Sequence, residues 1–298
     1  RHHRALAEFI LKYESKNIFE IGGGHGTLAR EYIGKRTNAT WTILEANPTP
    51  NYNHDRISFQ KGIFDDSCVI NNDIDTIVHS HLFEHIYSPV SFIKKLYDSL
   101  PNGGYTIFSV PFLEQQIKEN ITYCLGFEHT IFLNETFIEF FLHQAGFKII
   151  DKQIYQENHS LFYCAQKKSD SCIDVSFPNK YDEYLELFKN CIQFNENKVA
   201  DLNRLIKSSS EKVFLFGGHV ASQYLISYGL NIECLESILD NDPKKQGRRL
   251  YGTNLKVRSP QVLRNMGKVN VILRQGVFNK EIKEDILEQI NNNVVFWE

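Results

Sequence analysis

Four glycines fall within five positions near the amino end of this chain, in the stretch NIFEIGGGHGTLAREY at residues 17–32. An apolar, strand-like run precedes these glycines and a helix-like run follows them. Glycine readily adopts positive φ and lets another group approach the backbone closely. A glycine turn between a strand and a helix is therefore typical of a nucleotide-type ligand site, and it constrains the chain to an α/β fold.

Strand-like and helix-like runs alternate after the turn. The apolar, β-branched runs WTILEA, DTIVHS and YTIFSVP are separated by helix-like runs such as PVSFIKKLYDSL. This alternation predicts a doubly wound, Rossmann-like parallel sheet. The runs FKIIDKQIY and SLFYCAQ that close the block are predicted to be an antiparallel pair.

A second, smaller block of alternating strands and helices begins with KVFLFGG. Between the blocks, a polar, proline-containing stretch leads into a long amphipathic run with apolar residues at helical spacing. The sequence therefore predicts three parts: a ligand-binding α/β domain at 1–168, a linker with a connecting helix at 169–210, and a second Rossmann-like domain at 211–298.

Composition excludes several classes of protein. The 298 residues carry a net charge of −3, which gives no electrostatic reason to expect a nucleic-acid partner. No apolar run approaches the length of a membrane span, so no membrane partner is expected. The six cysteines include no C-x-x-C pair, and we expect reduced thiols in a cytoplasmic protein and no metal site.

Two cofactors commonly use a glycine turn after the first strand. The dinucleotide fingerprint needs a third small residue, and that position holds Thr27, an imperfect match. The S-adenosylmethionine pattern of an acid followed by alternate glycines fits Glu20, Gly22, Gly24 and Gly26. Glu45, which ends the second strand, can accept hydrogen bonds from ribose hydroxyls of either cofactor. The residues therefore favour S-adenosylmethionine and leave a dehydrogenase as a weaker alternative.

Residues 1–168 resemble class I S-adenosylmethionine-dependent methyltransferases. The resemblance rests on EIGGGHG, on LEA, on the stretch from DTIVHS to LPNGGYTIFSVP, and on FEHTIFLNETFIEFFLHQAGFKII. It implies a fold with the cofactor across the first strands. The residues implied to bind or border the cofactor are Glu20, Gly22, Gly23, Gly24, Gly26, Glu45, Phe64, Asp65, His79 and His81.

The second block narrows this resemblance. Its DNDPKKQGRRLYG stretch is similar to the D-x-x-P-x-K-Q-G…G run of carbohydrate C-methyltransferases that act on nucleotide-linked deoxysugars. Their Y-D-E-H-F motif corresponds here to GFEHT, which lacks the tyrosine, and their amino-terminal cysteine-rich zinc module has no counterpart in these residues. The resemblance implies methylation of a sugar, while methylation at carbon, oxygen or nitrogen stays open.

Methyl transfer needs a group that takes a proton from the acceptor, and histidine suits this task near neutral pH. His129 is the first candidate base, with Glu128 to orient it, and His85 in FEHI is the second. For each of these, a purely structural role is the alternative. The candidate substrate contacts are His159, His219, Lys245 and Arg248.

The sequence thus predicts an S-adenosylmethionine-dependent methyltransferase that acts on a small molecule. The expected acceptor is a sugar, a sugar nucleotide or a carbohydrate-linked group, in bacterial glycan or secondary-metabolite biosynthesis. The alternatives are a methyltransferase-like binding or regulatory module and a methyltransferase for another small molecule. The oligomeric state does not follow from the sequence.

Overall fold

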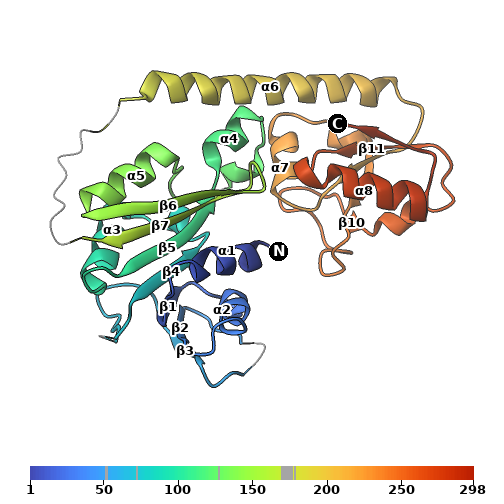
Figure 1. The fold of residues 1–298 in the computed structure, drawn as a ribbon. Helices are drawn as coiled ribbons and strands as arrows, with labels where there is room; N and C mark the ends of the chain where they lie inside the picture. Colours follow the sequence, from blue (N-terminus) through green and yellow to red (C-terminus); the bar gives the residue numbers. More distant parts are fainter. Residues whose placement is uncertain (51–52, 72, 127, 169–176, 178) are drawn as a thin grey trace. The chain divides into compact units, whose positions relative to one another are not determined.

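The computed structural model describes residues 1–50, 53–71, 73–126, 128–168, 177 and 179–298 (Figure 1). The chain divides into two compact units. Unit 1 consists of Arg1–Gln116 and Phe127–Asn179, and unit 2 consists of Ile117–Gly126 and Lys180–Glu298.

Unit 1 is built on a seven-stranded sheet with the strand order β3-β2-β1-β4-β5-β7-β6. The five strands from β3 to β5 are parallel, and β7 pairs antiparallel with both β5 and β6. The predicted doubly wound sheet with an antiparallel closing pair is therefore confirmed. The strands are β1 (Asn17–Ile21), β2 (Thr40–Glu45), β3 (Ile57–Lys61), β4 (Thr76–Ser80), β5 (Tyr105–Pro111), β6 (Phe147–Tyr155) and β7 (Ser160–Lys167).

Helices cover both faces of this sheet. One face packs against α1 (His2–Leu11) and α2 (Thr27–Ile33), and the other against α3 (Pro89–Ser99) and α5 (Glu135–Gln144). These helices bury one apolar stripe each, as amphipathic helices on a sheet do. The shorter elements are α4 (Leu113–Lys118) and the 3₁₀ turns Phe83–His85 and Tyr123–Leu125.

Unit 2 has a five-stranded, fully parallel sheet with the order β10-β9-β8-β11-β12. This confirms the predicted second Rossmann-like domain. The elements are α6 (Tyr181–Ser208), β8 (Val213–Phe216), α7 (Val220–Ser227), the 3₁₀ turn Ile232–Cys234, β9 (Leu235–Leu239), β10 (Val257–Arg258), the 3₁₀ turn Pro260–Leu263, β11 (Val269–Leu273), the 3₁₀ turn Gly276–Phe278, α8 (Asn279–Asp285), a π-helical turn (Ile286–Ile290) and β12 (Val294–Trp297).

The long helix α6 belongs to unit 2, whereas the sequence assigned it to a separate linker at 169–210. Its carboxyl half buries Val199, Leu202 and Ile206 in the core formed with β8, β9 and α7. Residues 117–126 also group with unit 2, although the sequence placed them in the first domain. Residues 169–176 of the predicted linker lie outside the described residues.

Among the described residues, no helix combines the length and the apolar character that crossing a membrane requires.

Candidate functional site

The switch point of the unit 1 sheet positions the candidate site. From β1 the chain winds outward to β2 and β3 and then returns to β4 on the other side of β1. Ligands of such sheets bind beyond the carboxyl ends of the strands at the point where the order reverses. The glycine turn follows β1, Glu45 ends β2, and His81 follows β4, so three predicted positions meet at this edge.

The glycine turn needs its glycines for different reasons. Gly22, Gly24 and Gly26 have φ of 74°, 53° and 76°, a region that side chains with a Cβ rarely adopt. A Cβ on Gly23 would lie 2.7 Å from the carboxyl carbon of Glu20, whereas a Cβ on Gly24 would have no neighbour within 4 Å. The turn therefore packs tightly inward at Gly23 and lies open at Gly24, where a ligand can approach the backbone.

Glu45 connects the end of β2 to the glycine turn. Its Oε2 accepts from the Gly24 N–H at 3.0 Å and its Oε1 accepts from the Asn47 N–H at 3.1 Å. An ionised carboxylate has about four lone-pair positions, so two remain for other donors. This geometry fits a pair of ribose hydroxyls, and the open backbone at Gly24 fits a ligand that lies along the turn. The residues present thus fit the nucleoside half of S-adenosylmethionine.

Glu20 lies behind the turn. Its side chain is 2% exposed, and its Oε2 accepts a hydrogen bond of 2.8 Å from Trp41 Nε1. Burial raises the pKa of Glu20 to about 7, while the bond from Trp41 opposes the shift and the nearby Glu45 adds to it. The sequence predicted a carboxylate at the cofactor, and the structure places this carboxylate underneath Gly23.

The raised pKa of Glu20 predicts a pH-dependent stability. Between pH 4.5 and 7 the unfolded chain releases this proton while the folded chain keeps it, so the free energy of unfolding falls as the pH rises. Glu20→Gln keeps an acceptor for Trp41 but has no proton to lose in this range. We expect its free energy of unfolding to rise relative to that of the parent by on the order of 3 kcal/mol from pH 4.5 to pH 7. Urea unfolding at several pH values measures the difference, and a difference that does not change with pH would contradict the prediction.

Phe64 and Asp65, which the resemblance places at the adenine, lie in the segment after β3. The Phe64 ring packs edge-on against Phe92 at 5.7 Å, with Lys95 Nζ 4.8 Å from its centre. Asp65 is exposed, and its Oδ1 accepts from the backbone N–H and the hydroxyl of Ser67. These bonds lower the pKa of Asp65 and keep its carboxylate ionised.

His79 lies elsewhere than the sequence predicted. Its side chain is fully buried, its ring stacks on Phe108 at 4.7 Å, and neither ring nitrogen has a hydrogen-bond partner among the described residues. Burial lowers its pKa to about 3, so the ring is neutral. The side chain is part of the core because β4 is buried on both faces, and it does not border the cofactor edge.

The candidate bases His85 and His129 lie together, with ring centres 5.0 Å apart. His85 Nδ1 donates to the backbone carbonyl of Glu128 at 2.9 Å, which leaves a lone pair on Nε2. The Glu128 side chain is exposed, so its carbonyl and not its carboxylate makes this contact. Phe127 of the same motif lies outside the described residues.

Glu84 is a residue of this site that the sequence reasoning missed. It is 3% exposed, its Oε1 lies 3.2 Å from His81 Nδ1, and its Oε2 has no partner among the described residues. One of its oxygens lies within 4.8 Å of ring nitrogens of both His85 and His129. The motif FEHI contained it, and the backbone N–H groups of Thr130 and Ile131 donate to its backbone carbonyl.

His159, a predicted substrate contact, precedes β7, and its Nδ1 lies 2.5 Å from Ser160 Oγ. The same hydroxyl lies 3.0 Å from His81 Nε2. The structure thus places His159 beside His81, which was predicted at the cofactor. The sequence reasoning passed over Ser160 and His2, the third histidine that joins this pair.

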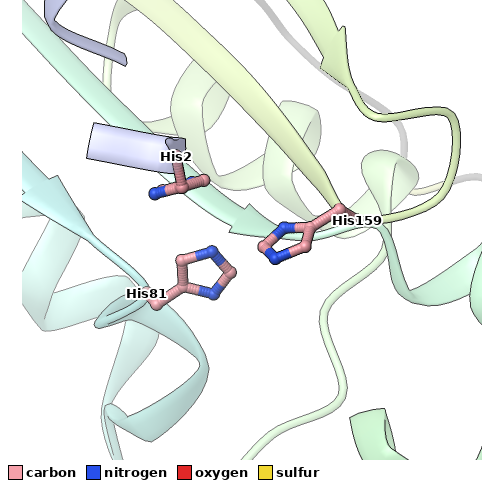
Figure 2. Close-up of side chains that lie close together, drawn as sticks. All are labelled: His2, His81 and His159. Carbon is pink, nitrogen blue, oxygen red and sulfur yellow. The ribbon is translucent and has the colours of Figure 1, made fainter. Parts of the chain in front are cut away.

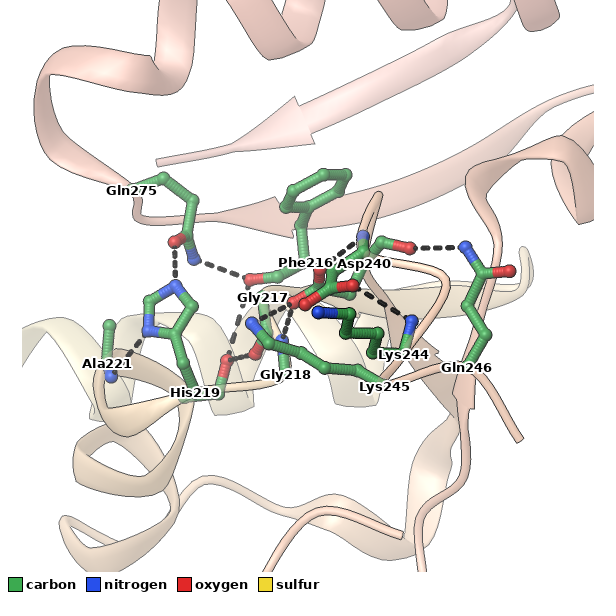
Figure 3. A network of polar contacts seen from close by, with 12 residues as sticks. Phe216, Gly217, Gly218, His219, Ala221, Asp240, Lys244, Lys245, Gln246 and Gln275 are labelled. Carbon is green, nitrogen blue, oxygen red and sulfur yellow. Dashed lines mark hydrogen bonds and ion pairs between the residues drawn. The ribbon is translucent and has the colours of Figure 1, made fainter. Parts of the chain in front are cut away.

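The glycine turn of unit 2 repeats the bonding of the first one. The Gly217 N–H donates to the Leu239 carbonyl at 2.7 Å. The Gly218 N–H donates to Asp240 Oδ2 at 2.8 Å (Figure 3). The turn after β1 likewise bonds to the carbonyl and the carboxylate of two consecutive residues at the end of the next strand. The two units therefore share one turn design.

The basic run after β9 folds around Asp240. Lys245 Nζ lies 3.0 Å from Asp240 Oδ2, and Gln246 Nε2 donates to the Asp240 carbonyl. Bonds from Asp242 N–H, Lys245 and Gly218 N–H outweigh burial and lower the pKa of Asp240. Lys245, a predicted substrate contact, is thus the ion-pair partner of a buried carboxylate. Arg248, predicted with it, is exposed.

His219 caps the amino end of α7. Its Nδ1 accepts from the Ala221 N–H at 3.2 Å, so its Nε2–H donates to Gln275 Oε1. Burial lowers the pKa of His219, which favours this neutral tautomer. Both ring nitrogens of His219 thus form hydrogen bonds within unit 2. A ligand at this turn would therefore contact backbone groups and not the imidazole.

The Asp240 network predicts a loss of stability. Asp240→Ala leaves two backbone N–H donors without their carboxylate acceptor and Lys245 without its partner. We expect unit 2 to lose about 2–4 kcal/mol. Urea unfolding followed by the fluorescence of Trp297, in unit 2, measures this loss. Asp242→Ala is the matched control because it removes a half-buried carboxylate that accepts from Lys244 N–H. Equal losses in both variants would contradict the role of Asp240.

Two family models match the chain. A methyltransferase domain matches residues 1–152, and a C-methyltransferase C-terminal domain matches residues 177–296. No curated protein matches the sequence significantly.

Solved structures resemble about half of the chain. Human N-acetylserotonin methyltransferase in complex with S-adenosylmethionine is 17% identical, with 56% of this chain and 52% of that chain covered and a TM-score of 0.44. An O-methyltransferase family protein of Burkholderia thailandensis is 12% identical, with 57% and 56% covered and a TM-score of 0.46. An S-adenosylmethionine-dependent methyltransferase of Mesorhizobium loti is 12% identical, with 51% and 90% covered and a TM-score of 0.41.

Proposed function

Because the chain belongs to the methyltransferase domain family and is an S-adenosylmethionine-dependent methyltransferase, we propose that it methylates a sugar, a sugar nucleotide or a carbohydrate-linked group. The observation that carries the acceptor class is the match of residues 177–296 to the C-methyltransferase C-terminal domain, which follows the methyltransferase domain in one chain. The sequence resemblance to sugar C-methyltransferases supports the same acceptor. The process it would serve is bacterial glycan or secondary-metabolite biosynthesis.

The cofactor residues have separate proposed roles. The open backbone at Gly24 lies along the cofactor, Gly22 and Gly26 provide the turn, and Glu45 accepts the ribose hydroxyls. Glu20 acts from beneath the turn, where its carboxyl supports Gly23 and Trp41. Phe64 and Asp65 are proposed to border the adenine, and His81 the methyl end of the site.

The bound cofactor supplies an electrophilic methyl group, and the chain must hold the acceptor and take its proton. A carbon next to a carbonyl group, or a hydroxyl, needs a base as it attacks. We assign this role to His129, with His85 as the second candidate, because the two rings are in contact and Glu84 places a buried carboxylate beside them. The Glu128 carbonyl fixes the tautomer of His85, so the role proposed for Glu128 is positioning.

Unit 2 is proposed to hold the part of the substrate that does not react. The turn at His219 and the exposed guanidinium of Arg248 offer donors for a phosphate. Lys245 can contribute only while it also neutralises Asp240. These contacts suit a nucleotide-linked sugar, whose phosphates are far from the reacting atom.

The remaining expectations concern partners and location. We propose a small-molecule substrate with no nucleic-acid partner, because the net charge is −3. We propose a cytoplasmic location, because the five described cysteines are free thiols.

Methyl transfer to a panel of acceptors tests the proposal. The protein is incubated with labelled S-adenosylmethionine and with sugar nucleotides, free glycans and unrelated small molecules, and mass spectrometry locates the methyl group. Transfer to a sugar nucleotide is the expected result, and the methylated atom decides between carbon and oxygen. Transfer only to non-carbohydrates would overturn the acceptor class, and cofactor binding without any transfer would favour a binding or regulatory module.

A further inference from the structure

Three histidines from distant parts of unit 1 come together beside the candidate site. His2 begins α1, His81 follows β4, and His159 precedes β7 (Figure 2). The ring centres are 5.0 Å apart for His2 and His81, 5.5 Å for His2 and His159, and 5.9 Å for His81 and His159. One nitrogen of each ring lies within 4.8 Å of a nitrogen of each of the others.

We propose that His2, His81 and His159 bind one divalent transition-metal ion of the Zn²⁺ type. Imidazole nitrogen is a common ligand of Zn²⁺, at about 2.0–2.1 Å, and three protein ligands leave a fourth position for water or another oxygen. In a tetrahedral site the ligand nitrogens are about 3.3 Å apart. The three ring nitrogens lie within 4.8 Å of one another, so each separation must shrink by at most about 1.5 Å to reach this spacing.

The cluster contains a ring nitrogen that is not engaged in a hydrogen bond among the described residues. Only a neutral imidazole offers a lone pair to a metal ion. His2 Nε2 is buried and has no hydrogen-bond partner among the described residues. This nitrogen is therefore available as a metal ligand.

Glu84 provides the outer support that metal-binding histidines usually have. Its Oε1 lies 3.2 Å from His81 Nδ1, so that nitrogen carries the proton and Nε2 of His81 carries the lone pair. Ser160 Oγ lies 3.0 Å from this Nε2, and metal binding would replace that hydrogen bond. His81 has φ of 48°, an uncommon conformation for a residue with a side chain, as often found at functional sites.

A second group of possible ligands lies nearby, consisting of Glu84, His85 and His129. Glu84 also touches the first group, because its Oε1 lies 3.2 Å from His81 Nδ1. Three imidazole ligands make the first group the better site for Zn²⁺. The experiment must nevertheless separate the two groups.

Metal content tests the proposal without any need for methyl transfer. The full chain, purified without a polyhistidine tag and stripped with a chelator, is titrated with Zn²⁺ by calorimetry and with Co²⁺ by visible absorption. One equivalent should bind, with the d–d spectrum of a low-symmetry, four-coordinate Co²⁺ site. His2→Gln and His159→Gln should weaken binding by more than about 100-fold, and Glu84→Gln by about 10–100-fold.

The matched controls are His3→Gln, which changes the next residue of α1, and His143→Gln on α5, because neither histidine belongs to the cluster. Both should bind like the parent, and circular dichroism verifies that every variant is folded. Parent binding no tighter than that of His2→Gln and His159→Gln would overturn the proposal. So would loss of the ion in His129→Gln but not in His159→Gln, which would place the metal in the second group.

Discussion

His129→Ala is expected to lower kcat for methyl transfer by about 10²–10⁴-fold while S-adenosylmethionine binds with nearly parent affinity. The reason is its position. His129 lies in the segment between β5 and α5, in ring contact with His85 and within 4.8 Å of the Glu84 carboxylate. The cofactor residues come from the ends of β1 and β2, so the substitution leaves them in place. Steady-state kinetics and calorimetry measure the two effects.

His85→Ala is the matched comparison, because it removes the other imidazole of the pair. If it alone abolishes turnover, the roles of the two histidines are reversed. The base must be neutral to accept a proton, so the parent should gain activity as the pH rises, and the variant that lacks the base should lose this dependence. If both variants keep parent turnover, neither imidazole takes the proton.

His143→Gln is a further control, since it replaces a histidine on α5 outside both histidine groups. It should leave kcat and its pH profile unchanged. A fall in kcat equal to that of His129→Ala would indicate a general sensitivity of unit 1 rather than a role in proton transfer.

The parts of the site that the sequence predicted well are those set by local backbone requirements. The alternate glycines after an apolar run predicted a turn, and three of them do adopt positive φ. The position of Glu45 at the end of β2 followed from the strand pattern alone. Both features depend on a few neighbouring residues, so no knowledge of tertiary packing was needed.

The parts that the sequence did not predict depend on contacts between distant residues. The family resemblance placed His79 at the cofactor, but both faces of β4 are covered, and the ring stacks in the core. The backbone carbonyl of Glu84 accepts from the N–H groups of Thr130 and Ile131, which lie more than 40 residues later. The cluster at His2 joins positions about 80 residues apart, a separation that only the sheet topology brings together.

Charge alone does not show that Lys245 has a partner within its own loop. In the sequence it belongs to a basic run that suits a phosphate, whereas in the structure it neutralises Asp240 five residues earlier. A lysine that pairs with a buried carboxylate of its own loop can contact a ligand only while it keeps that ion pair. The observed boundaries of unit 2 differ from the predicted ones for a similar reason. The sequence of α6 is compatible with a connecting helix, and only the structure shows that its apolar face is buried in the core of unit 2.

Glu45→Ala is expected to weaken S-adenosylmethionine binding by about 10²–10⁴-fold. Two of the carboxylate's lone-pair positions accept from Gly24 and Asn47 N–H, and the other two are proposed to accept the ribose hydroxyls. Each hydrogen bond to a charged group contributes roughly 1.5–3 kcal/mol, so removing the two ribose bonds accounts for the range. Calorimetry with S-adenosylmethionine and S-adenosylhomocysteine measures it.

Glu45→Gln separates the contribution of charge from that of geometry, because the amide keeps one acceptor oxygen but turns the other position into a donor. Its affinity should fall between those of the parent and Glu45→Ala. NAD serves as the competing ligand, since a dinucleotide would use the same carboxylate. The parent could instead bind NAD tightly and S-adenosylmethionine not at all, with NAD binding lost in Glu45→Ala. This result would show that the turn binds a dinucleotide cofactor. Equal S-adenosylmethionine affinity in the parent and Glu45→Ala would instead mean that the carboxylate serves only to fix Gly24 and Asn47.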